Sequence, residues 1–191
     1  MSVQRRTLIL SGVFAPWVAA HAAPDATPDA EAARSLRAGG VVAVFRHTLA
    51  PGTYDPPGFR LADCSTQRNL NDEGRAQAQR LGARFAALGL RPARVLSSPW
   101  CRCLDTARGA FGSAQAWEAL GSPEGRSNAE RAAQQQALRS ALAAVPADGF
   151  EVWVTHNFVI ADLVAVSTAS GEGVVLRGGP AVQLLHRLPE P

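Results

Sequence analysis

The sequence contains no lysine, so all 19 of its strongly basic side chains are arginines. This absence excludes any mechanism that needs a lysine nucleophile or a Schiff base. It also means that a single arginine carries little functional information. Blocks of like charge are lacking too, and the formal net charge is only +3. We therefore expect no nucleic-acid partner, since such a partner would require a clustered basic face.

Cysteine is scarce, with Cys64, Cys101 and Cys103 as the three residues of this type. Three thiols allow one disulfide and one free thiol. Cys64 is the shared partner of the two plausible pairings, because Cys101 and Cys103 lie too close in sequence for an easy bridge. Three buried thiols are the alternative. A zinc site is not expected, since there is no second cysteine pair and no nearby His-x-His motif.

The N-terminal apolar stretch, residues 8–20, is too short to span a membrane, and Pro16 interrupts it. Arg5 and Arg6 precede it, and the small-residue motif Ala20-His21-Ala22 follows it. This order is typical of a cleavable signal peptide. We expect residues 1–22 to be removed, leaving residues 23–191 as one domain in a bacterial periplasm without stable membrane insertion. The paired arginines match twin-arginine export only in part, which leaves the export route open.

The rest of the chain alternates short apolar runs with amphipathic stretches, which predicts an α/β fold. Helices are expected over residues 30–38, 71–88, 127–145 and 158–166 and from Pro99 onward. Strands are expected over residues 41–45, 93–98 and 151–156, with a short one within 111–120 and a terminal hairpin over 173–177 and 181–188. The connection over residues 48–70 is unusually long, and loops of that length commonly serve function.

Three of the expected strands are followed by basic side chains. Arg46 and His47 end the first run, His156 and Asn157 follow the third, and the second leads through Pro99 to Arg102. In open α/β sheets, ligands bind outside the carboxyl ends of the strands. Guanidinium groups offer forked donors that match phosphate, and a helix that begins at Asn157 would also favour an anion. The pattern therefore predicts a phosphate site.

These residues also resemble a known family. Arg46-His47, the segment from Ser98 to Ala107 with its Ser-Pro-x-x-Arg pattern, and Thr155-His156 are similar in type and order to motifs of the histidine phosphatase (phosphoglycerate-mutase-like) superfamily. The resemblance covers roughly residues 41–163. It implies a three-layer α/β/α sandwich and a phosphatase that acts on a small phosphorylated substrate. His47 would be the nucleophile, with Arg46, Arg102 and His156 as ligands of the phosphoryl group.

The implied chemistry is reasonable in itself, because a neutral imidazole can attack phosphorus and form a phosphohistidine that water then hydrolyses. The arginines would stabilise the negative charge on the transferring group, so neither a metal nor another cofactor is expected.

The sequence departs from the family pattern at two positions. Thr48 replaces the glycine that commonly follows the nucleophile, and a side chain there could crowd the pocket or alter the backbone geometry that orients His47. Asn157 replaces an aspartate that serves as general acid in one branch. Another branch takes a glutamate from the segment after the second arginine, which makes Glu118 the first candidate for the acid, with Asp63 and Glu124 behind it. Thr53 occupies the place of a phosphate-binding asparagine in one branch, so we expect it near the phosphate.

Other features leave alternatives open. His186 is expected to be structural, and Arg60, Arg68 and Arg75 to be surface or loop residues. A non-catalytic phosphate- or phosphosugar-binding protein on the same fold is the main rival, and a metal-dependent hydrolase is another. The loops over residues 48–70 and 114–126 would select the substrate, either a lipopolysaccharide-core sugar phosphate or a scavenged phosphate monoester. Export argues against a glycolytic mutase and against protein phosphohistidine as substrate.

Overall fold

The computed structural model describes residues 28–191, and the predicted signal peptide lies outside this range. Along the chain the elements are α1 (Pro28–Ala38), β1 (Val41–Arg46), the 3-10 helix η1 (Cys64–Thr66), α2 (Asp72–Ala87), β2 (Arg94–Ser97), α3 (Cys101–Phe111), β3 (Gln115–Ala116), the 3-10 helix η2 (Glu118–Leu120), α4 (Asn128–Ala143), β4 (Phe150–Thr155), α5 (Asn157–Val164), β5 (Gly173–Arg177) and β6 (Gln183–Leu188). None of the helices in residues 28–191 combines the length and the hydrophobicity of a membrane-spanning segment.

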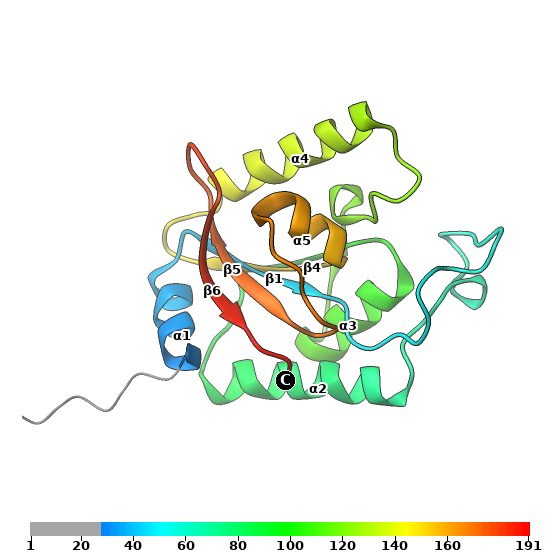
Figure 1. The fold of residues 1–191 in the computed structure, drawn as a ribbon. Helices are drawn as coiled ribbons and strands as arrows, with labels where there is room; N and C mark the ends of the chain where they lie inside the picture. The colour runs from blue at the N-terminus through cyan, green and yellow to red at the C-terminus, as the bar shows by residue number, and fades with distance from the viewer. Residues whose placement is uncertain (1–27) are drawn as a thin grey trace, which may run out of the picture.

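The apolar run before His47 forms the central strand of a six-stranded sheet with the order β3-β2-β4-β1-β5-β6 (Figure 1). Strand β1 pairs in parallel with β4 and antiparallel with β5. Strand β2 is also parallel to β4. The carboxyl ends of β1, β2 and β4 therefore lie at one edge of the sheet. Strands β5 and β6 form the predicted terminal hairpin.

Alternating residues of β1 face opposite sides of the sheet, and both sides are covered. Val41, Ala43 and Phe45 pack in a cluster with residues of α1, α2 and α3. Val42 and Val44 pack in a second cluster with residues of α4 and α5. All five side chains are fully buried, which explains why the strand is apolar throughout rather than alternating. Figure 1 shows α4 and α5 on one side of the sheet and α2 and α3 on the other. The predicted α/β/α sandwich is confirmed.

Local signals place the helix starts correctly in two cases and incorrectly in one. Asn71 caps α2 by accepting a hydrogen bond from the Gly74 backbone N–H. Ser127 opens α4 within a capping box. The expectation that Pro99 begins the third helix is wrong, because α3 starts at Cys101. The Trp100 backbone N–H instead donates to Ser98 Oγ, which holds an extended residue before the first turn.

The contact between α2 and α3 depends on a glycine. A Cβ atom at Gly82 would lie 2.2 Å from the Ala110 carbonyl oxygen, so the two helices would have to move apart. We predict that Gly82→Ala destabilises the protein by about 1–3 kcal/mol, although alanine favours an isolated helix by about 1 kcal/mol. Chemical denaturation would measure the change. Gly109→Ala on α3 is the control, since its Cβ would meet only the Ala78 methyl at 3.2 Å, and a larger loss there would contradict this account.

Candidate active site

The side chains at the carboxyl ends of the strands enclose a pocket of about 210 Å³. Six of the predicted site residues line it: Arg46, His47, Thr53, Arg102, His156 and Asn157. Arg46 is the last residue of β1, and its register partner in β4 is Thr155, directly before His156. The parallel pairing of these strands thus places the two histidines side by side, with ring centroids 5.6 Å apart.

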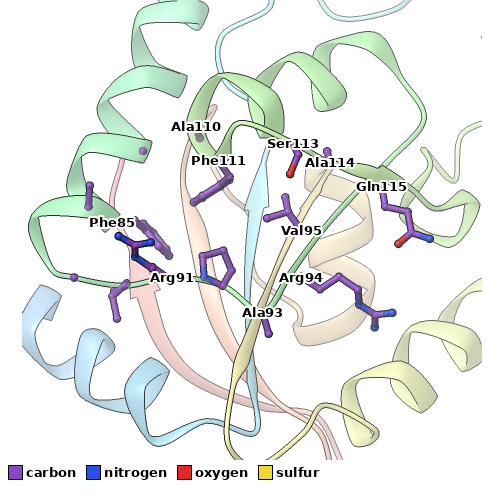
Figure 2. Close-up of a pocket in the computed structure, with 15 residues that line it drawn as sticks. Phe85, Arg91, Ala93, Arg94, Val95, Ala110, Phe111, Ser113, Ala114 and Gln115 are labelled. Atoms are coloured by element: carbon purple, nitrogen blue, oxygen red, sulfur yellow. The ribbon is translucent and has the colours of Figure 1, made fainter.

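A larger pocket of about 790 Å³ lies at the opposite end of β2 (Figure 2). The lining residues include Phe85, Phe111 and the start of β2, and no histidine or acidic residue is among them. Figure 2 shows Arg91 and Arg94 beside this pocket. Arg94 already donates to Glu151, with its Nη2 2.8 Å from the carboxylate. The pocket beside β2 has the greater volume, but both predicted catalytic histidines line the smaller pocket.

His47 is held with one ring nitrogen available. Its Nδ1 lies 2.8 Å from the Thr48 carbonyl oxygen, which can only accept a hydrogen bond. Nδ1 therefore carries the proton, and in the neutral ring Nε2 has the lone pair. The side chain is 2% exposed. This arrangement orients a potential nucleophile through a backbone contact rather than through an acidic side chain.

Both histidines are kept neutral. Burial, followed by the charges of Arg102, Arg68 and Arg46, lowers the pKa of His47 from 6.5 to about 3, although the Thr48 carbonyl works in the opposite direction. Burial and the neighbouring cations also lower the pKa of His156 well below its ordinary value. His156 Nε2 lies 2.9 Å from Ser98 Oγ. At neutral pH the positive charge of the pocket therefore resides on the arginines.

Three arginines surround His47 and retain unused donors. Arg46 Nη1 donates to the Thr168 carbonyl oxygen at 2.8 Å, and Arg68 Nη1 donates to that of Ala50. Within residues 28–191, the Nε atoms of Arg46, Arg68 and Arg102 are buried without a hydrogen-bond partner. Buried donors are normally paired. A bound anion such as phosphate would supply the missing acceptors.

Arg102 is the most enclosed of these cations, at 4% exposed, and it pairs with Asp55. Its Nη1 lies 2.9 and 3.1 Å from the two carboxylate oxygens. Asp55 also accepts from the Arg68 backbone N–H and from the Trp100 indole N–H. Burial raises the pKa of the Asp55 carboxyl, but these hydrogen bonds and the Arg102 charge outweigh burial, and the pKa lies below its ordinary value.

A disulfide between Cys64 and Cys101 joins the long loop, residues 48–70, to the first residue of α3. This resolves the pairing that the sequence left open. Cys103 is free and buried. Burial raises the pKa of its thiol to about 12, so it remains a protonated thiol. The disulfide lies next to Arg102 and therefore anchors the loop beside the pocket.

Thr48 does not crowd the pocket. Its backbone N–H donates to Thr106 Oγ1 at 3.0 Å, and its own hydroxyl lies 3.0 Å from the same oxygen. The side chain is fully buried and is not among the pocket-lining residues. A non-glycine residue after His47 is thus accommodated by a hydroxyl partner on α3.

Two expectations from the sequence need correction. Glu118 is exposed in η2 and does not line the pocket, whereas Glu124 does. Asp63, the other acidic candidate, caps η1 and pairs with Arg60. Arg68, expected to be a surface or loop residue rather than a ligand, lies in the long loop but lines the pocket. No motif spacing marks Arg68 or Glu124, and the unusual length of the loop was the only cue for Arg68.

His186 and Asn157 lie where they were expected. His186 Nε2 lies 2.8 Å from Ser35 Oγ on α1, a structural contact. The Asn157 side-chain oxygen accepts from the Thr168 backbone N–H at 2.7 Å, so its amide is held at the pocket wall. Within residues 28–191, no group of three or more His, Cys, Asp or Glu side chains is arranged to hold a metal ion.

Fold and pocket together define an α/β protein with a basic, histidine-containing site. Residues 60–121 match the model of the histidine phosphatase superfamily, branch 1. This segment includes Arg68 and Arg102, while His47 and His156 lie outside it. A comparison with curated proteins found no match.

Three solved structures show the same fold. The chain is similar to the protein histidine phosphatase SixA complexed with tungstate, with 17% identity, a TM-score of 0.54 and coverage of 78% of this chain and 97% of SixA. For Rv3214 from Mycobacterium tuberculosis the identity is 18% and the TM-score 0.59, with coverage of 78% of this chain and 97% of Rv3214. For the mycobacterial glucosyl-3-phosphoglycerate phosphatase Rv2419c the identity is 17% and the TM-score 0.57, with coverage of 79% of this chain and 99% of Rv2419c. The predicted resemblance is confirmed, since residues 60–121 match the model of this superfamily and the three solved structures share the fold.

The neutral histidines predict a dependence of stability on pH. The pKa of His47 is near 6.5 in the unfolded chain and about 3 in the folded protein, so acid protonates the unfolded chain first. Stability should be greatest above about pH 6.5 and should fall as the pH drops toward 3, by up to about 1.4 kcal/mol per pH unit for each such histidine. Urea denaturation of the wild type and of His47→Gln would measure both slopes, and equal slopes would contradict the prediction.

Proposed function

We propose that the protein is a phosphatase that hydrolyses phosphate monoesters through a phosphohistidine on His47, without a metal ion. The observation that carries this proposal is a neutral, oriented imidazole among three arginines whose buried Nε donors have no partner. Such a site combines a nucleophile with fixed positive charge where a phosphoryl group develops negative charge. The arginines supply the stabilisation that a divalent cation provides in other phosphatases.

In the first step, His47 Nε2 attacks phosphorus while the bond from phosphorus to the ester oxygen breaks. The phosphoryl group moves to the imidazole, and the leaving oxygen departs with the bonding electrons and takes up a proton. Arg46, Arg68 and Arg102 hold the phosphoryl oxygens, and His156 lies across from His47 to complete the pocket. The Nδ1–H to Thr48 hydrogen bond stabilises the positive charge that develops on the ring.

Glu124 is the acid that we propose for the leaving group, in place of Glu118. It lines the pocket from the segment between η2 and α4. Asn157 cannot take this role, since an amide has no proton to give at neutral pH. In the second step, Glu124 accepts a proton from water as that water attacks the phosphohistidine. Inorganic phosphate and free His47 are the products.

The substrate is proposed to be a small phosphate monoester. SixA and Rv2419c, which share the fold, are named as a protein histidine phosphatase and a glucosyl-3-phosphoglycerate phosphatase. The pocket of about 210 Å³ has the size of a phosphate group with part of its ester. We also propose that the protein acts after export, as the sequence of residues 1–22 indicates.

Hydrolysis of p-nitrophenyl phosphate by residues 23–191 in the presence of EDTA tests the proposal. We predict turnover that EDTA does not reduce and that falls by roughly 1,000-fold or more in His47→Ala, the scale on which loss of a nucleophile acts. Undiminished turnover in His47→Ala would contradict the proposed nucleophile, and loss of activity in EDTA would favour a metal-dependent hydrolase. Phosphate binding without any turnover would favour the phosphate-binding protein instead.

The role of Glu124 can be tested separately. We predict that Glu124→Gln lowers kcat for an alkyl phosphate by about 100- to 10,000-fold, the usual contribution of a general acid. The loss should be much smaller for p-nitrophenyl phosphate, whose leaving group needs little protonation. Glu118→Gln is the matched control and should retain wild-type kcat on both substrates. Equal losses in the two variants, or no loss in Glu124→Gln, would contradict the assignment.

A further inference from the structure

Large apolar side chains are exposed at three positions within residues 28–191. Tyr54 is 66% exposed, Phe158 55% and Leu184 38%. Leu184 lies on β6. Tyr54 belongs to the long loop and Phe158 to the first turn of α5. Phe158 lines the active-site pocket, and both aromatic residues line a pocket that adjoins it. Exposed aromatic side chains that gather beside a catalytic pocket indicate a binding surface.

Tyr54 and Phe158 line another pocket, distinct from the two described above and also of about 210 Å³, which we call the ring subsite. Its other lining residues are Pro123, Glu124 and Arg131. Phe158 and Glu124 line the phosphate pocket as well, so the two pockets adjoin. Glu124 stands between them, which is where an acid must lie to protonate an oxygen leaving the phosphoryl group.

The walls of the ring subsite are anchored. Tyr54 precedes Asp55, whose carboxylate is held by Arg102 and Trp100. Arg131 donates to Asp162 at 2.8 Å. The one cation of the subsite therefore already has a carboxylate partner. The subsite thus offers apolar and aromatic surface rather than a second anion site.

We propose that the ring subsite binds the leaving group of the substrate, and that this group is a ring with an apolar face, such as a phenol. The inference rests on the proposed phosphatase function and specifies the substrate class. A flat ring can stack on Tyr54 or Phe158 while its phosphate reaches His47 and the arginines. A short aliphatic ester such as glycerol phosphate would leave these aromatic faces in water and gain little from them.

Binding of two non-hydrolysable phosphonates tests the subsite without requiring turnover. Phenylphosphonate and methylphosphonate differ only in the group that would enter it. Calorimetry should be carried out at a pH where both ligands are dianions. We expect the wild type to bind phenylphosphonate about 10-fold more tightly, and the preference to fall to about 2-fold or less in the double variant with Tyr54→Ala and Phe158→Ala. Tyr54 does not line the phosphate pocket, so in the single variant Tyr54→Ala the affinity for methylphosphonate should stay within about 2-fold while the preference for phenylphosphonate falls.

Leu184→Ala is the matched control. It removes the third exposed apolar side chain, which lies on β6 and lines neither the phosphate pocket nor the ring subsite. It should retain the full preference. Equal affinity of the wild type for both phosphonates, or a preference that persists in the double variant, would overturn the ring subsite while leaving the phosphatase proposal intact. Failure to bind either ligand would contradict the phosphate pocket and with it both proposals.

Discussion

The ion pair between Arg102 and Asp55 is the interaction on which the site depends. An arginine that is 4% exposed needs a partner, because removing one member of a buried pair costs about 3–5 kcal/mol. Asp55 supplies that partner from a loop, and the same carboxylate holds the Trp100 indole and the Arg68 backbone. One carboxylate thus positions two of the three arginines that surround His47. It leaves their Nε donors free, so the pocket keeps an excess of positive charge for an anion.

The long loop is built around this constraint. The Cys64–Cys101 disulfide fixes it to the start of α3, one residue before Arg102. Gln67 strengthens the same junction, since its side-chain oxygen accepts from the Cys101 backbone N–H at 3.0 Å. The loop also carries Thr53, Tyr54 and Arg68. A disulfide beside the site therefore suits a protein whose loop must hold charged groups in place, and it agrees with the export that we propose.

Sequence reasoning predicted the parts of the site that follow from the sheet. Arg46 ends a buried strand, and His47 and His156 come directly after buried strands. Parallel pairing brings such positions together. Sequence reasoning failed where contacts between residues far apart in the chain determine which loop side chains reach the pocket. Asp55 meets a side chain 47 positions later, Arg68 turns inward to the Ala50 carbonyl, and Glu124 rather than Glu118 reaches the pocket. No local pattern encodes these contacts. The disulfide pairing could be predicted only in part. Proximity in the sequence excluded a bridge between Cys101 and Cys103, and only the fold could decide which of the two pairs with Cys64.

The central claim is that His47 becomes phosphorylated during turnover. The most direct measurement is a rapid alkaline quench of the protein with a phosphate ester, followed by mass spectrometry of its peptides, since phosphohistidine survives in alkali. The account predicts a phosphoryl group on the peptide that contains His47, at a level that approaches one per active chain when dephosphorylation is slow. A catalytically active protein in which the phosphoryl group is found on another residue, or is never found on the protein, would contradict the account.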